Sequence, residues 1–252
     1  MMISIIKYLQ TAGKILLFFS YGFSSLVYAG AFNLSPIRIE LSGAVGTEVL
    51  HVTNSGSTDA TIQLQTMHWS QSNGEDRLKS TRDIIATPQI FNLRSGASQL
   101  IRVGIAKKID LSKEATYRLV LEEIPPPPPP GFQGLQVALR VSLPVFIKPV
   151  NAPAQSLDIR FIDQGDAIPG EIRLELINKG LVHVQLLDIK IYAADEKEKL
   201  IANLEQNIYL LAGQKKQITV KKNSDLPLPI SIFIRAETRA GKMEFHATSG
   251  SP

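Results

Sequence analysis

Short segments in which apolar and polar residues alternate follow one another along the first half of this chain. None of them has a convincing helical period, and turn signals such as Asn54-Ser55-Gly56 separate them. The expected strands lie at residues 32–41, 48–53, 61–69, 84–93, 99–105, 116–124 and 135–147. We expect a polar loop at 71–76, and Pro88 suits an edge strand or a change of sheet. About seven short, closely spaced strands are typical of an immunoglobulin-like β-sandwich.

A second all-β unit follows a linker at residues 151–154, Asn-Ala-Pro-Ala. Its expected strands lie at residues 157–161, 171–178, 182–193, 206–211, 216–221 and 230–237, with a last hairpin that ends near 243–247. Together these patterns predict an all-β fold in two domains, residues 30–150 and 151–252.

The stretch from Ile124 to Pro149 is the most unusual part of the pattern. Six consecutive prolines, Pro125 to Pro130, prefer an extended helix that spans roughly 19 Å at about 3.1 Å per residue. The strand expected at 135–147 then places five apolar residues on one face: Leu135, Val137, Leu139, Val141 and Leu143. Such a face often covers its own domain's core, and a proline run also suits a solvated surface loop. The alternative is that another protein uses part of this face.

Residues 1–29 have the pattern of a cleaved secretory signal. Lys7 and Lys14 supply the basic region, and Ile15 to Val27 supply the apolar stretch. Cleavage is expected after Ala29, with Ala31 as the alternative. A retained anchor helix is the competing interpretation, but polar residues interrupt the short apolar stretch. We therefore expect a protein outside the cytoplasm with no stable membrane insertion after cleavage.

The composition points away from several function classes. There are no cysteines, so disulfides, thiol nucleophiles and thiolate metal sites are excluded. Loss of the two N-terminal lysines lowers the formal charge from +4 to +2, too little to indicate a nucleic-acid partner. The four histidines are widely spaced, and neither a metal-binding HExxH motif nor a GxSxG motif occurs. We expect no enzyme activity, no metal and no cofactor.

Several sequence pieces, in order, resemble the periplasmic pilus-assembly chaperones of the chaperone–usher type, especially their archaic, spore-coat-like branch. The resemblance covers nearly all of the chain after the signal. It rests on Phe32-Asn33-Leu34-Ser35-Pro36-Ile37-Arg38, Ala86-Thr87-Pro88-Gln89-Ile90-Phe91, Gln99-Leu100-Ile101-Arg102-Val103, Tyr117-Arg118-Leu119, Glu123-Ile124-Pro125, Leu143-Pro144-Val145-Phe146, Asn178-Lys179-Gly180 and Tyr209-Leu210-Leu211-Ala212-Gly213.

The resemblance implies two immunoglobulin-like domains set at an angle, with a cleft between them. It also implies a mechanism, in which the chaperone completes a pilin-like subunit that lacks the last strand of its own sandwich. Leu135, Val137 and Leu139 match the positions of the donor residues in this donor-strand complementation, and Val141 is a fourth candidate. The implied partners are pilin-like subunits and an outer-membrane usher.

In such chaperones, basic residues in the cleft hold the C-terminal carboxylate of the subunit. A planar guanidinium suits this role because it grips a carboxylate by two hydrogen bonds. Arg38 aligns with the arginine of the family's first strand, but Pro144 stands near the place of the usual lysine. We take Arg118 as the substitute, with Arg102 and Arg140 as weaker candidates.

The sequence thus predicts a non-enzymatic periplasmic chaperone that stabilises pilin-like subunits and delivers them to an usher. One alternative is a secreted adhesive or carbohydrate-binding β-sandwich module. A surface aromatic or metal-binding cluster would indicate this module, yet the chain has one Trp and 7% aromatic residues. A secreted β-rich hydrolase is the other alternative, and no convergent catalytic set supports it.

Overall fold

The computed structural model describes residues 32–128, 130–149, 151, 154–162, 170–194, 199–223 and 231–248, which form strands, turns and loops. The expected secretory signal, residues 1–29, lies outside the described residues. No helix in the described ranges has the length and apolarity needed to cross a bilayer.

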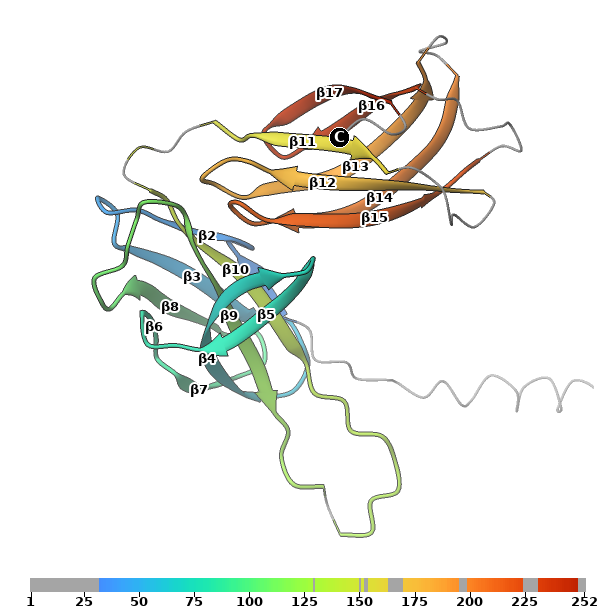
Figure 1. Cartoon of the computed structure of the whole chain (residues 1–252). Helices are drawn as coiled ribbons and strands as arrows, with labels where there is room; N and C mark the ends of the chain where they lie inside the picture. The colour runs from blue at the N-terminus through green and yellow to red at the C-terminus, as the bar shows by residue number, and fades with distance from the viewer. Residues whose placement is uncertain are drawn as a thin grey trace, which may run out of the picture.

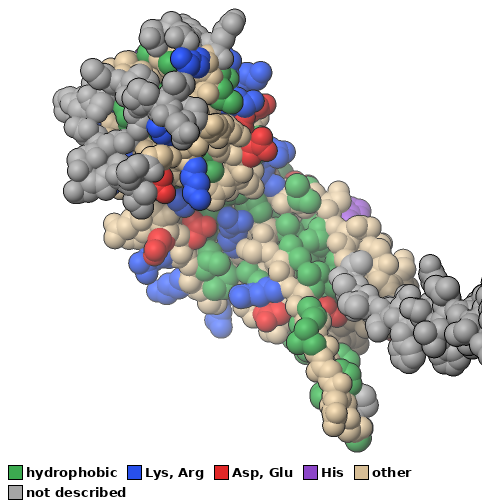
Figure 2. All heavy atoms as spheres, turned by 90° about the vertical axis from the view of Figure 1, so that its right-hand side faces the viewer, with side chains coloured by type: hydrophobic (Ala, Val, Ile, Leu, Met, Phe, Trp, Pro, Cys, Tyr) green, Lys and Arg blue, Asp and Glu red, His purple; other side chains and the backbone are tan. Residues whose placement is uncertain are grey.

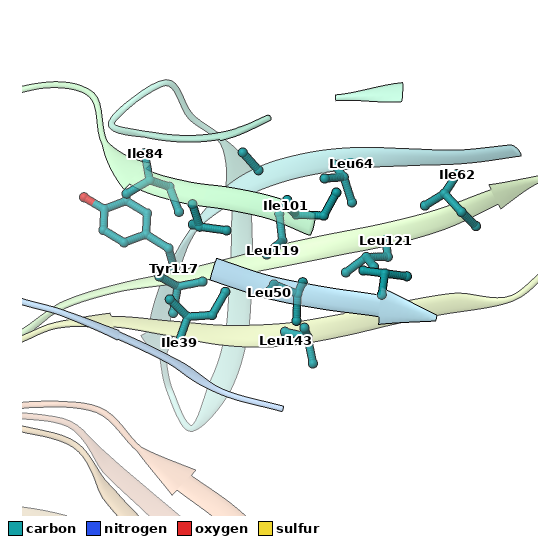
Figure 3. Packing of buried hydrophobic residues seen from close by; sticks show 14 of the residues in the cluster. Ile39, Leu50, Ile62, Leu64, Ile84, Ile101, Tyr117, Leu119, Leu121 and Leu143 are labelled. Carbon is teal, nitrogen blue, oxygen red and sulfur yellow. The ribbon is translucent and has the colours of Figure 1, made fainter. Parts of the chain in front are cut away.

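Ten strands build the first domain: β1 (Phe32–Ser35), β2 (Ile39–Leu41), β3 (Thr47–Asn54), β4 (Ala60–Ser72), β5 (Glu75–Ser80), β6 (Ile84–Thr87), β7 (Ile90–Leu93), β8 (Ser98–Ile105), β9 (Ala115–Ile124) and β10 (Arg140–Ile147). One sheet has the order β1-β3-β8-β6, and the other has the order β2-β10-β9-β4-β5, with β7 also paired to β4. Figure 3 shows apolar side chains from both sheets, including Leu50, Ile101 and Leu119, pointing toward one another. The first domain is therefore a β-sandwich with a single apolar core.

Two of the expected strands are each divided between the two sheets. The segment 32–41 forms β1 in one sheet and β2 in the other, and the chain changes sheets around Pro36. The segment 84–93 likewise forms β6 and β7 on either side of Pro88. Of the two alternatives at Pro88, an edge strand or a change of sheet, the structure shows the change of sheet. A proline has no N–H with which to continue a ladder.

The expected polar loop at 71–76 is wrong. Strand β4 continues to Ser72, and β5 returns beside it after a two-residue turn. Asn73 and Gly74 occupy that turn with φ angles of 54° and 78°. This is the left-handed backbone that Asn-Gly supplies in tight hairpins. The polar composition of the segment concealed the strand, because all six residues of β5 are exposed.

Seven strands build the second domain: β11 (Leu157–Phe161), β12 (Glu171–Asn178), β13 (Val184–Ala193), β14 (Leu200–Leu210), β15 (Lys215–Lys221), β16 (Ser231–Thr238) and β17 (Gly241–Thr248). They form sheets of order β11-β12-β15 and β14-β13-β16-β17 around a second apolar core. The strands of this domain run across one end of the first (Figure 1). The predicted fold class of two immunoglobulin-like sandwiches is confirmed, while the boundary near residue 150 stays a prediction.

Candidate functional site

A long loop between β9 and β10 extends away from the first domain (Figure 1). Hydrophobic side chains follow this arm in Figure 2. Leu135 is 86% exposed and Val137 is 70% exposed, and Gln136 between them donates a hydrogen bond from Nε2 to the Pro126 carbonyl, at 2.8 Å. Regular strand structure begins only at Arg140, not at residue 135 as expected. The segment 135–139 therefore lies outside any strand in the free chain.

The apolar face of β10 continues from the domain core into this exposed segment. Leu143, Val145 and Ile147 are buried in the core of the first domain, and Val141 packs against it. The preceding alternate residue, Leu139, is half-buried, and its carbonyl accepts a hydrogen bond from the Glu123 N–H at 2.9 Å. The four predicted donor residues thus continue one apolar row that emerges from the core at Val141.

One edge of β10 is also open at its N-terminal end. Strand β9 pairs with the whole of β10, but on the opposite side β2 pairs only with Val145–Ile147. No other described strand pairs with Arg140–Pro144 on that side. An open edge with an adjacent apolar row can accept the backbone of another chain.

A polar cleft of about 360 Å³ lies between the two domains. Its lining residues are Arg38, Glu40, Glu114, Lys148, Gln155, Val182, His183, Arg239 and Ala240. Arg38 forms an ion pair with Glu40, and Lys148 Nζ lies 2.6 Å from the second carboxylate oxygen of Glu40. Sequence reasoning identified Arg38 but missed Lys148 and Glu40.

Arg118 occupies a different part of the domain junction. It stands on β9 opposite Pro144 of β10, as expected for a residue beside the donor strand. Its guanidinium lies 3.7 Å from the centre of the Trp69 ring and 5.3 Å from that of Tyr209. Burial lowers the pKa of Arg118, and the charge of Asp76 partly opposes this shift. Arg118 does not line the cleft that contains Arg38, so the structure does not bring the two predicted anchors together in one pocket.

The two weaker candidates lie away from the junction. Arg102 is exposed on the outer face of β8, opposite Val49, in a surface hollow that also contains Ile85 and Leu100. Arg140 is exposed at the start of β10, opposite Glu122 of β9. Neither residue lines the cleft of Arg38.

Buried polar contacts fix the two domains against each other. The Gln71 side chain of β4 donates to the Tyr209 carbonyl at 2.8 Å and accepts from the Leu211 N–H at 2.9 Å. One oxygen of Glu114 accepts from the backbone N–H of His183 at 2.8 Å and lies 2.7 Å from its Nδ1. These residues carry no sequence motif, and only the structure identifies their role.

Aromatic rings fill the space between these polar contacts. Phe146 of β10 stacks on His183 with ring centres 3.7 Å apart, and Trp69 lies against Phe146 and Tyr209. His183 lines the Arg38 cleft, whereas Trp69 and Tyr209 contact Arg118. The rings therefore connect the two predicted anchors. In the described part of the chain, no group of three or more potential metal ligands occurs.

The protein thus has a two-domain β-sandwich architecture, with a polar cleft between the sandwiches and an apolar segment beside an open strand edge. Residues 31–153, which include β1–β10, match the family model of the pili and flagellar-assembly chaperones, PapD N-terminal domain. No curated protein sequence matches the chain significantly.

Solved chaperone structures share the whole fold. A chain of the CsuC–CsuE chaperone–tip adhesion subunit complex, from the archaic chaperone–usher Csu pili of Acinetobacter baumannii, matches with a TM-score of 0.64 and 18% identity over 88% of this chain and 100% of that chain. The E. coli chaperone DraB matches with a TM-score of 0.57 and 16% identity over 87% and 97% of the two chains. A chain of the Salmonella enterica SafA pilin–SafB chaperone complex matches with a TM-score of 0.58 and 16% identity over 87% of this chain and 97% of that chain. At these identities the likeness establishes the fold.

Proposed function

We propose that the protein is a non-enzymatic chaperone of the chaperone–usher type, which binds pilin-like subunits by donor-strand complementation. The observation that carries the proposal is the apolar row beside an open strand edge, in which Leu135 and Val137 are exposed and Leu139 is half-buried. Full burial of each such side chain contributes about 1.5–3 kcal/mol. Residues 135–138 lie outside any strand, and their backbone could form a ladder with the subunit, whereas the backbone of Leu139 already bonds to Glu123. Val141 is the fourth donor residue and joins this row to the core.

Arg38 is the proposed anchor for the C-terminal carboxylate of the subunit. Its side chain lies in the cleft between the domains and is 18% exposed, so a bound carboxylate would be partly shielded from water. Charge-assisted hydrogen bonds are stronger in such surroundings. Arg118 packs on Trp69 at the other end of the aromatic cluster and does not line this cleft, so it takes no part in holding the same carboxylate. Arg102 and Arg140 have no part in this proposal because they lie outside the junction.

The proposed location is the periplasm, reached through cleavage of the predicted signal at residues 1–29. Placement in the archaic branch is part of this proposal and rests on the sequence resemblance; the match to a chain of the archaic Csu complex is one of fold. Delivery of the bound subunit to an outer-membrane usher completes the proposed function. Strand exchange with the next subunit would drive assembly without a nucleotide, because the folding free energy of the completed subunit supplies the driving force.

The test is to replace Val137 by Asp in a strain that also expresses a tagged pilin-like subunit from the same organism. A carboxylate cannot enter the apolar groove of the subunit without a large desolvation cost. We expect Val137→Asp to reduce co-purified subunit at least about tenfold, which corresponds to about 1.4 kcal/mol. The fold of the free chaperone should be unchanged because the side chain of Val137 is exposed.

Gln136→Asp is the matched control, since it adds the same charge one residue away on the opposite face of the expected donor strand. It should retain most of the subunit. Equal recovery of subunit with Val137→Asp and with the wild type would refute donor-strand complementation by this segment.

A further inference from the structure

Glu40 pairs with two of the cations that line the cleft, Arg38 and Lys148, in the way that a bound carboxylate would. One of its oxygens pairs with the Arg38 guanidinium, and the other lies 2.6 Å from Lys148 Nζ. Two cations that each take one oxygen of the same carboxylate form a charge-assisted bridge. The free chain therefore already contains a carboxylate at the proposed anchor.

The strand pairing explains why these three residues meet. Strand β2 runs parallel to the end of β10 and places Glu40 beside Phe146. The chain leaves β10 through Lys148, whose backbone N–H donates to the Leu41 carbonyl at 2.9 Å. Arg38 directly precedes β2, so the pairing brings its side chain and that of Lys148 to the same carboxylate. Lys148 thus provides a second cation in the cleft, although Pro144 stands near the place of the lysine that is usual in the family.

The charge balance of the cleft shows that the site favours an anion. Its lining contains the cations Arg38, Lys148 and Arg239 and the carboxylates of Glu40 and Glu114. Glu114 is engaged with His183, and Glu40 is the carboxylate that touches Arg38 and Lys148. Without the charge of Glu40, the positive excess among these five groups would rise from one to two.

Glu40 remains ionised at neutral pH. Burial by itself would raise its pKa, but the hydrogen bond from Lys148 and the charges of Arg38 and Lys148 together lower the pKa below its ordinary value.

We propose that Arg38 and Lys148 form the carboxylate-binding pair of this cleft and that Glu40 is a built-in competitor, which an incoming peptide carboxylate must displace. This inference rests on the proposed anchoring role of Arg38. Glu40 lowers the affinity of the cleft for a terminal carboxylate, so that tight binding requires the donor segment as well. A free peptide end without a complementary subunit groove is then held weakly.

The experiment titrates the purified protein with N-acetylglycine, which carries a peptide-like free carboxylate, and follows binding by NMR. N-acetylglycinamide has nearly the same shape without the charge and serves as the ligand control. We expect Glu40→Gln to lower the dissociation constant for N-acetylglycine at least about fivefold, because one competing charge is removed. Neither protein should bind the amide measurably.

Further variants test whether the tighter binding of N-acetylglycine depends on Arg38 and Lys148. In the Glu40→Gln background, Arg38→Ala and Lys148→Met should each abolish the gain in affinity. Glu175→Gln removes another lysine-paired carboxylate, 3.4 Å from Lys215 in the second domain, and should leave binding unchanged. Thermal unfolding of each variant verifies the fold, and Glu40→Ala provides a second neutral substitution at the same position.

Unchanged or weaker binding of N-acetylglycine by both Glu40→Gln and Glu40→Ala would overturn the inference. Equal binding of the amide would overturn it too, since the site would then not recognise the charge. The probe lacks any residue that can pair with the donor segment. The result is therefore independent of the subunit-capture test with Val137→Asp, which decides the proposed function.

Discussion

At the scale of single residues, a buried asparagine ends one strand in each domain. Asn54 closes β3, where its side-chain NH₂ donates to the carbonyls of Thr58 and Leu93 and its oxygen accepts from the Gly56 N–H at 2.9 Å. Asn178 closes β12 with the same contact to Gly180, also at 2.9 Å. The sequence shows these sites as Asn-x-Gly turn signals. It does not show that the amide also satisfies carbonyls from distant strands.

We expect Asn54→Ala to destabilise the protein by about 2–3 kcal/mol, because buried carbonyl and N–H groups lose their partners. Denaturant unfolding measures this change. Asn92→Ala is the control: Asn92 is exposed and accepts a single side-chain hydrogen bond from Thr61. It should stay within about 0.5 kcal/mol of the wild type. Similar losses in the two variants would contradict the role given to Asn54.

At the scale of elements, the alternation of apolar and polar residues predicted the positions of most strands well. The strands at 157–161 and 171–178 have the predicted bounds, and most others differ from them by one or two residues. Strand β14 begins at Leu200, earlier than the predicted residue 206, and several of its added residues are only partly buried or exposed. Alternation detects strands that bury every second residue, so the fully exposed strand β5 gives no such signal. The first part of β14 gives a weak one because its buried residues, Ile201 and Ala202, are adjacent.

The hairpin β4–β5 provides the prediction at this scale. Gly74 has a φ of 78°, and an added Cβ would lie 3.2 Å from Lys216 Cγ in the second domain. We expect Gly74→Ala to cost about 1–2 kcal/mol through the left-handed backbone. Equilibrium unfolding gives the value. Gly46→Ala adds a methyl group in open space and should be nearly neutral. A neutral Gly74→Ala would show that the turn adapts without strain.

At the scale of the whole molecule, a few buried contacts determine how the domains meet. The Gln71 side chain, the Glu114–His183 pair and the rings of Trp69, Phe146 and Tyr209 all cross between the domains. Each contact joins residues far apart in the sequence. No local pattern predicts such a junction, because the partners become neighbours only after both sandwiches have folded.

Gln71→Ala tests this junction. The variant leaves the Leu211 N–H and the Tyr209 carbonyl without the partners shown here, and each loss costs about 1–3 kcal/mol. We expect calorimetry to show two separated unfolding transitions and small-angle scattering to show a wider range of domain angles. The exposed Gln217 of β15 provides the control substitution Gln217→Ala. An unchanged transition in Gln71→Ala would assign the rigidity of the junction to the aromatic rings instead.

The sequence alone determined the two-sandwich fold, most strands and the apolar row at 135–141, because each follows from side-chain alternation and turn chemistry within a short stretch of chain. It also selected Arg38 through the family resemblance. Only the tertiary structure showed that the part of the row that precedes Val141 lies outside the domain core, and that Lys148 and Glu40 meet Arg38 in the cleft. These relations depend on the pairing of β2 with β10 and on the packing of one domain against the other. Such long-range contacts have no local signature in the sequence.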